Sequence, residues 1–224
     1  MSSDRPLRRV KGSYGSHPSQ FVEYFGDTGV CIGLIHGGYW RDRYGLDLMD
    51  ELALDLAARG YRVANVEYRR LGQGVHWPTL LDDVLMGSAG CDALVGHSAG
   101  GHLALLAGQQ LGIPVVAQAP LADLRSGLAL SDGAVGELLD GDLDLLGEAS
   151  PIERLPIGVP VLILHGDADQ HVPISQAIAY HGAAAVAGDD VEFVRLAGDD
   201  HFVHIDPTST AWATAVAWLD RRLR

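Results

Sequence analysis

The sequence is poor in the positive charge that binding to nucleic acid requires. Its 16 lysine and arginine residues are outnumbered by 29 aspartate and glutamate residues, which gives a formal net charge of −13. A surface of this sign repels phosphate backbones and anionic lipid headgroups. We therefore expect neither nucleic acid nor a membrane surface as a partner, and the charge mildly disfavours anionic substrates.

Cysteine is also scarce. The two cysteines, Cys31 and Cys91, stand in apolar stretches near predicted strands, which favours buried free thiols over a disulfide or a metal site. The ten histidines include no His-x-x-x-His pair with a general-base glutamate, and no glycine-rich stretch matches a phosphate or dinucleotide loop. The sequence thus predicts no metal and no cofactor.

Long hydrophobic runs are absent as well. No apolar stretch reaches the ~18 residues that a membrane-spanning helix needs. The first twelve residues, MSSDRPLRRVKG, are polar and lack the apolar core of a signal peptide. We expect a cytoplasmic protein.

The chain does have enough apolar material for a sizeable core. It has 224 residues, of which 47% are hydrophobic, which is typical of one compact domain. We expect this domain to span residues 20–224 and residues 1–19 to form a mobile or loosely docked N-terminal arm. The arm carries a basic cluster: Arg5, Arg8, Arg9 and Lys11.

Hydrophobic patterning predicts strands and helices in alternation. The expected strands cover residues 20–25, 30–35, 61–67, 93–96, 113–118, 161–165 and 191–196. The expected helices cover residues 46–59, 78–86, 102–111, 174–186 and 209–223. Such alternation predicts an α/β fold, with a twisted, mainly parallel sheet and helices on both faces. Residues 121–150 break the rhythm, and we expect a short cap there that overhangs the end of the sheet near Ser98.

The stretch ALVGHSAGG, residues 93–101, carries the clearest chemical signal. A Gly-x-Ser-x-Gly sequence between a strand and a helix is typical of a nucleophile elbow, in which Ser98 adopts a strained backbone conformation and its hydroxyl is exposed above the sheet. The residue after the nucleophile, Ala99, then supplies one backbone N–H group to an oxyanion hole.

A serine hydroxyl needs a base, and the base needs an orienting acceptor. Ligands bind at the carboxyl ends of the strands in a parallel sheet, so the loops after the late strands are where these partners are expected. The loop after residues 161–165 offers Asp167 and Asp169, and the loop after residues 191–196 offers His201. The resulting order of serine, aspartate and histidine is that of an α/β-hydrolase.

Four other histidines compete for a role. His97 is a poor base because consecutive residues at the elbow point apart, and His102 is expected to pack on the helix after Ser98. His165 ends a strand and is expected to fix the loop that contains Asp169. His204 is the one serious rival to His201 as the base.

Four motifs together resemble the α/β-hydrolase superfamily: HGGYW, GHSAGG, HGDADQHVP and GDDHF. The first two are most similar to the kynurenine formamidase and small-esterase group. This resemblance covers residues 20–224. It implies that Asp169, rather than Asp167, is the acid and that His201 is the base.

The loop His36-Gly37-Gly38 follows a predicted strand and lacks side chains where a backbone would have to approach a substrate. The resemblance assigns the remaining oxyanion-hole donors to Gly38 and to Gly37 or Tyr39. We expect His36 to hydrogen-bond the loop. Tyr39 and Trp40 are expected to pack in the loop, although an aromatic substrate group would be able to stack there.

The sequence therefore predicts a serine hydrolase that cleaves small carboxylic esters through an acyl-enzyme intermediate. The short cap favours a small acyl group over long lipid chains. The alternative is an arylformamidase that acts on N-formyl amides. A third reading, from a different class, is a member of the fold that binds a small molecule without catalysis.

Overall fold

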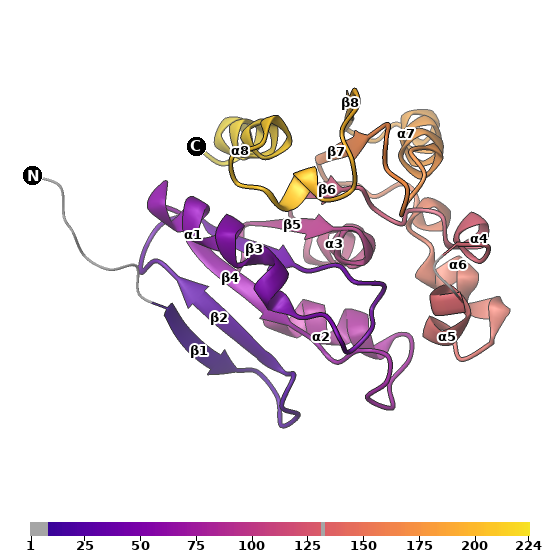
Figure 1. Ribbon diagram of the computed structural model, residues 1–224, viewed down its shortest axis with the longest axis horizontal. Coiled ribbons are helices and arrows are strands. Elements are labelled where there is room, and N and C mark those ends of the chain that lie inside the picture. The colour runs from indigo at the N-terminus through magenta and orange to yellow at the C-terminus, as the bar shows by residue number, and fades with distance from the viewer. Residues whose placement is uncertain (1–8, 131–132) are drawn as a thin grey trace, which may run out of the picture.

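Eight strands form one sheet at the centre of the molecule, in the order β1-β2-β4-β3-β5-β6-β7-β8 (Figure 1). The computed structural model describes residues 9–130 and 133–224. The strands are β1 (Arg9–Ser13), β2 (Phe21–Phe25), β3 (Cys31–Ile35), β4 (Arg62–Glu67), β5 (Ala93–His97), β6 (Val115–Gln118), β7 (Val161–Gly166) and β8 (Val191–Leu196).

The sheet is mainly parallel, as predicted. Along the part of the sheet ordered β4-β3-β5-β6-β7-β8, every neighbouring pair of strands is parallel. Strand β2 runs antiparallel to both of its neighbours, β1 and β4. The carboxyl ends of β3, β5, β7 and β8 therefore lie at one edge of the sheet, where their loops can meet.

Helices cover both faces because the central strands are apolar on both faces. Every residue of β3, β5 and β7 is buried. One face packs against α1 (Asp50–Ala58) and α8 (Thr210–Leu223). The other face packs against α2 (Thr79–Gly87), α3 (Ala99–Leu111) and α7 (Ser175–Ala187).

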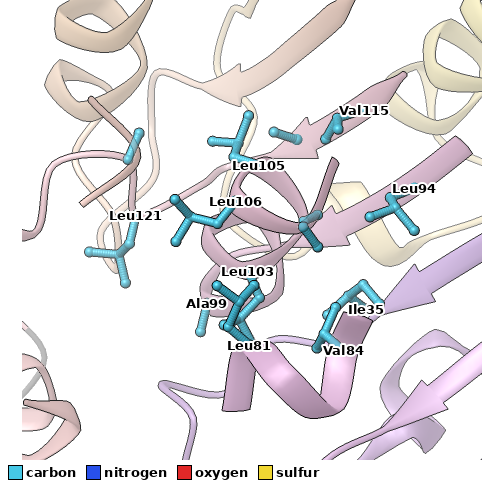
Figure 2. Close-up of a cluster of buried hydrophobic side chains, with 14 of the residues drawn as sticks. Ile35, Leu81, Val84, Leu94, Ala99, Leu103, Leu105, Leu106, Val115 and Leu121 are labelled. Atoms are coloured by element: carbon cyan, nitrogen blue, oxygen red, sulfur yellow. The ribbon is translucent and has the colours of Figure 1, made fainter. Parts of the chain in front are cut away.

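Consecutive residues of a strand point to opposite faces of the sheet and pack in different hydrophobic cores. Along β5, for example, Leu94 joins the core under α3 while Val95 joins the core under α1 and α8. Figure 2 shows the first core, in which Leu81 of α2 and Leu103 of α3 meet. Fully burying one such leucine side chain stabilises the fold by about 1.5–3 kcal/mol.

The helices end where local chemistry requires it. Gly112 and Gly188 follow α3 and α7 in the left-handed conformation, with φ of 69° and 83°, which favours glycine. At the start of α8, the Ser209 side chain accepts a hydrogen bond from the backbone N–H of Trp212 at 3.0 Å. The first turn of the helix predicted over residues 46–59 is a 3₁₀ segment, Leu46–Met49, which continues into α1.

The prediction of an N-terminal arm over residues 1–19 is wrong for residues 9–13, which form edge strand β1. This strand escapes the hydrophobic pattern because it is exposed almost throughout and Val10 is its one large apolar side chain. Arg9 pairs with Asp50 at 3.0 Å, and the Lys11 ammonium lies 3.3 Å from the centre of the Phe21 ring. The basic residues Arg5 and Arg8 lie outside the described residues.

Residues 121–150 break the alternation of strands and helices, as expected. The described residues of this segment include the short helices α4 (Leu124–Gly127), α5 (Ala134–Leu138) and α6 (Leu146–Ala149) and the 3₁₀ turn η3 (Leu143–Leu145). Their buried leucines extend the core beside α2 and α3. His102 Nε2 on α3 donates to the carbonyl of Ala149 at 2.7 Å, so the segment is tied to the helix that follows Ser98.

Cys31 and Cys91 are buried free thiols, as predicted, with their sulfur atoms 3.6 Å apart. Over the ranges 9–130 and 133–224, none of the helices has the length and apolar character to span a bilayer.

The turn from β5 into α3 tolerates no side chain at Gly100. A Cβ atom there would overlap the backbone carbonyl oxygens of Ile35 and His36. Backbone atoms cannot move aside as a flexible side chain can, so added volume strains the sheet. The exposed Gly182 in α7 is the opposite case, because a Cβ there meets nothing within 4 Å.

We predict that Gly100→Ala lowers the free energy of unfolding by about 3 kcal/mol. The matched variant Gly182→Ala raises it by about 1 kcal/mol, because alanine is the better helix former. Urea unfolding followed by circular dichroism measures both values. Equal stabilities for the two variants would contradict the packing described for the turn.

Candidate active site

Ser98 occupies the turn between β5 and α3 in a strained conformation. Its φ of 57° and ψ of −120° lie where residues with a side chain rarely fall. Such a conformation costs about 1–3 kcal/mol and persists only where the surroundings impose it. Here the backbone N–H of Ser98 donates to the carbonyl of Gln118 at 2.8 Å, and its carbonyl accepts the first bond of α3 from His102 at 3.1 Å.

The loop after β7 and the loop after β8 bring Asp169 and His201 together. Asp169 Oδ2 accepts a hydrogen bond from His201 Nδ1 at 2.6 Å, a short distance for such a pair. The Asp169 side chain has no exposed surface and that of His201 is 6% exposed. The other carboxylate oxygen accepts backbone N–H bonds from His171 at 2.8 Å and Val172 at 2.9 Å.

His165 supports the same carboxylate, as the sequence predicted for the loop that it precedes. Its Nε2 lies 2.8 Å from the carbonyl of Val172 and 3.3 Å from Asp169 Oδ2, so both acceptors face one N–H group. Burial alone would raise the pKa of Asp169. The hydrogen bonds from His165 and His201 outweigh burial and hold this pKa well below its usual value, so the carboxylate is ionised at neutral pH.

Asp167, the other acid in this loop, is engaged elsewhere. Its carboxylate accepts bonds from the Arg195 side chain at 3.0 Å and from the backbone N–H of Gly198 at 2.6 Å. These contacts hold the loops after β7 and β8 side by side. The acid brought to His201 is therefore Asp169.

His97 does not act on the Ser98 hydroxyl in this arrangement but tethers the His201 loop. Its Nε2 donates to the His201 carbonyl at 2.9 Å, and the two rings lie 4.6 Å apart. Burial, and then the neighbouring His201 and His204, hold the pKa of His97 well below its usual value. The ring is therefore neutral. Sequence analysis missed this tether, which residue spacing does not reveal.

His204, the rival base, is fully buried and is not among the residues that line the candidate cavity. Burial, followed by the proximity of His165 and His201, lowers the pKa of His204 to about 3. Its carbonyl accepts a bond from Gln118 Nε2 at 3.0 Å. The ring is thus a neutral part of the core beneath His201.

The loop after β3 passes directly over Ser98. A Cβ atom on Gly37 would come within 2.9 Å of the Ser98 Cβ, and one on Gly38 would enter the Tyr44 ring. Gly38 has φ of 103°, and Tyr39 and Trp40 have φ of 52° and 57°, so three successive residues adopt the left-handed region. Only glycine allows the backbone to come this close to Ser98.

His36 holds this loop, as predicted. Its Nδ1 lies 2.8 Å from the carbonyl oxygen of Gly37, and its Nε2 lies 3.0 Å from Glu67 Oε1. Trp40 is fully buried and packs edge-on against His102, with ring centroids 5.2 Å apart. Tyr39 instead reaches across the opening, where its hydroxyl donates to the His171 carbonyl at 2.8 Å.

These loops enclose a cavity of about 110 Å³. It is lined by Gly38, Tyr39, Tyr44, Leu48, His97, Ser98, His171, His201, Phe202 and Ile205. Ser98 and His201 thus border one small, largely apolar space. Within the described parts of the chain, none of residues 121–150 lines this cavity. A more open hollow of about 250 Å³ adjoins it past His171, His201 and Phe202.

Sequence reasoning placed Ser98, Asp169, His201 and Gly38 at one edge of the sheet, and the structure brings them together there. It missed Tyr44, Leu48 and the other apolar residues of the cavity wall, which carry no chemical signature. Glu67 was also missed. The sequence did offer a signal for Glu67: it is the last residue of a predicted strand, and the site lies at the edge of the sheet where the parallel strands end.

The family model of the prolyl oligopeptidase family matches residues 92–224. Esterase LipC of Mycobacterium tuberculosis is 25% identical over 88% of this chain, and the chain spans 60% of the length of that protein.

Two solved structures are similar in fold. A truncated carbohydrate esterase from gut microbiota has a TM-score of 0.78 at 18% identity, and 95% of each chain is covered. Esterase B from Lactobacillus rhamnosis has a TM-score of 0.75 at 18% identity, covering 97% of this chain and 85% of that one. The sheet described above is therefore that of the α/β-hydrolase fold. Because the family match spans more than half of the chain, this protein belongs to the prolyl oligopeptidase family.

Proposed function

We propose that this protein is a serine hydrolase that cleaves small carboxylic esters through an acyl-enzyme intermediate. The observation that carries the proposal is the 2.6 Å hydrogen bond between His201 Nδ1 and Asp169 Oδ2, beside a cavity that Ser98 and His201 both line. Because Nδ1 is occupied by the carboxylate, Nε2 is the ring nitrogen left to take a proton.

In the first step, His201 removes the proton of the Ser98 hydroxyl as the oxygen attacks the ester carbonyl. The ionised Asp169 holds the imidazole in one tautomer and stabilises the imidazolium that forms. The low pKa of Asp169 means that the proton stays on His201 rather than passing to the carboxylate.

Negative charge then develops on the carbonyl oxygen and needs fixed donors. We assign these to the backbone N–H groups of Ala99 and Gly38, with Gly37 or Tyr39 as a further donor. Ala99 begins α3, where the helix dipole also favours negative charge. Losing one such donor typically raises the barrier by about 3–4 kcal/mol.

Collapse of the tetrahedral intermediate expels the alcohol, which receives the proton from His201. Water then enters, gives its proton to His201 and attacks the acyl-enzyme, which releases the acid and restores Ser98. Apart from this water, the proposed steps use only these side chains and backbone amides.

The walls of the cavity support a small, neutral acyl group. The space is about 110 Å³, its lining is mainly apolar, and none of the described residues that line it is acidic, lysine or arginine. Such a pocket binds a short acyl chain by burying it and offers little room for a long one. The similar proteins reported above include several esterases, which favours the same reaction.

The alternative substrate is an N-formyl aryl amide, as in a kynurenine formamidase. Three aromatic side chains line the cavity and would be able to stack on an aryl group: Tyr39, Tyr44 and Phe202. A formyl group is smaller still than an acetyl group, so both substrates fit the acyl side. We favour the ester because the similar proteins reported above are esterases.

We further propose that residues 20–224 act as one domain and that residues 121–150 form a small cap at its rim. Glu137 in α5 pairs with Arg41 at 2.8 Å, which joins this segment to the loop that follows Trp40. Both side chains are partly exposed, so the pair contributes little to stability and can open.

A fluorophosphonate probe tests the nucleophile. We expect it to modify Ser98 and no other serine in the folded protein, because the reaction needs an activated hydroxyl. Intact-mass and peptide mass spectrometry locate the adduct. Ser98→Ala abolishes labelling, whereas Ser150→Ala, which removes a buried serine that bonds the Leu124 backbone, leaves it intact. An adduct that persists in Ser98→Ala argues against the proposal.

Replacing each of the two histidines tests the base. We expect His201→Ala to lose about 10⁴-fold or more of kcat on p-nitrophenyl acetate, because the proton acceptor is gone. His204→Ala lowers thermal stability, since it leaves a hole in the core, but keeps kcat within about threefold. Steady-state rates measured well below the melting temperature separate the two. The opposite pattern would transfer the role to His204.

Substrate preference is tested with a panel of acyl donors. We expect kcat/KM on p-nitrophenyl acetate and butyrate to exceed that on the octanoate by about tenfold or more, because the cavity is short. N-formylkynurenine is the comparison for the amide reaction, and a higher value there establishes the formamidase alternative. Binding of a small molecule with no turnover of any substrate would support the non-catalytic reading.

A further inference from the structure

A buried contact between a carboxylate and an imidazole supports the loop of Gly37 and Gly38 from strand β4. Glu67, the last residue of β4, is 5% exposed, and its Oε1 lies 3.0 Å from His36 Nε2. His36 is fully buried and stacks on Tyr68, with ring centroids 4.4 Å apart. Neither Glu67 nor His36 is a lining residue of the cavity within the described chain, so any effect on substrate must pass through the loop.

The other nitrogen of the His36 ring reaches the peptide unit between Gly37 and Gly38. Nδ1 lies 2.8 Å from the Gly37 carbonyl oxygen, and it must donate because a carbonyl only accepts. In a planar trans peptide, the C=O and N–H groups point in opposite directions. With the carbonyl directed at buried His36, the N–H of Gly38 is directed away from it, and Gly38 borders the cavity together with Ser98.

We propose that Glu67 is a positioning residue for the oxyanion hole, which acts through His36 to fix the direction of the Gly38 N–H group. The inference rests on the proposed hydrolase function, since it concerns the same tetrahedral oxygen. It assigns a role to a carboxylate that neither contacts substrate nor belongs to the four motifs.

The carboxylate is suited to this role because four donors converge on it. Oε1 faces His36 Nε2, the Tyr68 backbone N–H and the Arg70 guanidinium, each at 3.0 Å. Oε2 accepts from the backbone N–H of Leu46 at 3.1 Å. An amide in place of the carboxylate would turn its NH₂ group toward one of these donors, whichever way it is rotated.

Charge adds to this geometry. Both nitrogens of His36 face acceptors, the Gly37 carbonyl and the Glu67 carboxylate, and a hydrogen bond to an ionised acceptor is stronger than one to a neutral acceptor. Burial would raise the pKa of Glu67, but the bonds from His36 and the charge of Arg70 outweigh burial and lower it. Without that negative charge, the bond to His36 Nε2 is weaker, and the ring is held less firmly against the Gly37 carbonyl.

The test compares Glu67→Gln with the unmodified enzyme on p-nitrophenyl acetate. We expect kcat to fall by about 10- to 100-fold, less than the ~10²–10³-fold loss on removing an oxyanion-hole donor outright. KM stays within about twofold, because the cavity wall is unchanged. A short alkylboronic acid, which adds to Ser98 as a tetrahedral anion, inhibits the variant more weakly by the same factor as the loss of kcat.

Asp83→Asn is the matched control, because Asp83 is a second buried carboxylate near the same strand. It bonds Gln20 at 2.8 Å and Arg69 at 2.7 Å, and within the described chain its hydrogen bonds do not reach the Gly37 loop. We expect this variant to lose stability but to keep kcat within about twofold. Equal losses of kcat in the two variants, or no loss in Glu67→Gln, would overturn the proposal.

His36→Gln keeps the inference testable if Glu67→Gln does not fold. The single variant must show the same loss of kcat without a change in KM, and the double variant must add little further loss, because both residues act on one peptide. Full additivity overturns the proposal. If the unmodified protein neither turns over esters nor labels at Ser98, the proposed function itself fails, a result distinct from an active enzyme that is indifferent to Glu67.

Discussion

The hydrogen bond between His201 Nδ1 and Asp169 Oδ2 is the constraint that gives the site its shape. It joins the loops after two neighbouring strands, β7 and β8, and it determines which edge of the imidazole can turn toward Ser98. The Asp169 carboxylate can hold this position because its other oxygen is anchored by two backbone N–H groups. An ionised group with every acceptor direction in use thus helps to fix loops that are otherwise exposed.

Histidine serves two physical purposes around this bond. His97, His102 and His204 are buried, and burial keeps each of them neutral, so they act as packed rings that donate or fill space. His36 is also buried, but it faces a carboxylate and a carbonyl and binds both. The surroundings, rather than the residue type, decide whether a histidine in this protein bonds a carboxylate, tethers a loop or is part of the core.

Most of the fold follows from the sequence because parallel strands buried on both faces must be apolar, and β3, β5 and β7 are nearly uninterrupted apolar runs. Strand β1 was missed because an exposed edge strand needs no apolar residue. The order Ser98, Asp169, His201 was readable because each residue follows a strand end. The cavity wall was not readable, because Tyr44, Leu48 and Ile205 meet only after distant loops fold together. The choice between Asp167 and Asp169 rested on family resemblance, and their different hydrogen bonds give it a physical basis.

The tether from His97 has a mechanical consequence. His97 and Ser98 are consecutive, and His97 Nε2 holds the carbonyl of His201 at 2.9 Å. The dipeptide at the end of β5 therefore carries the Ser98 hydroxyl and also hydrogen-bonds the backbone of His201. When thermal motion displaces this segment, the two partners shift in concert, and their separation fluctuates less than that of groups borne by independent loops.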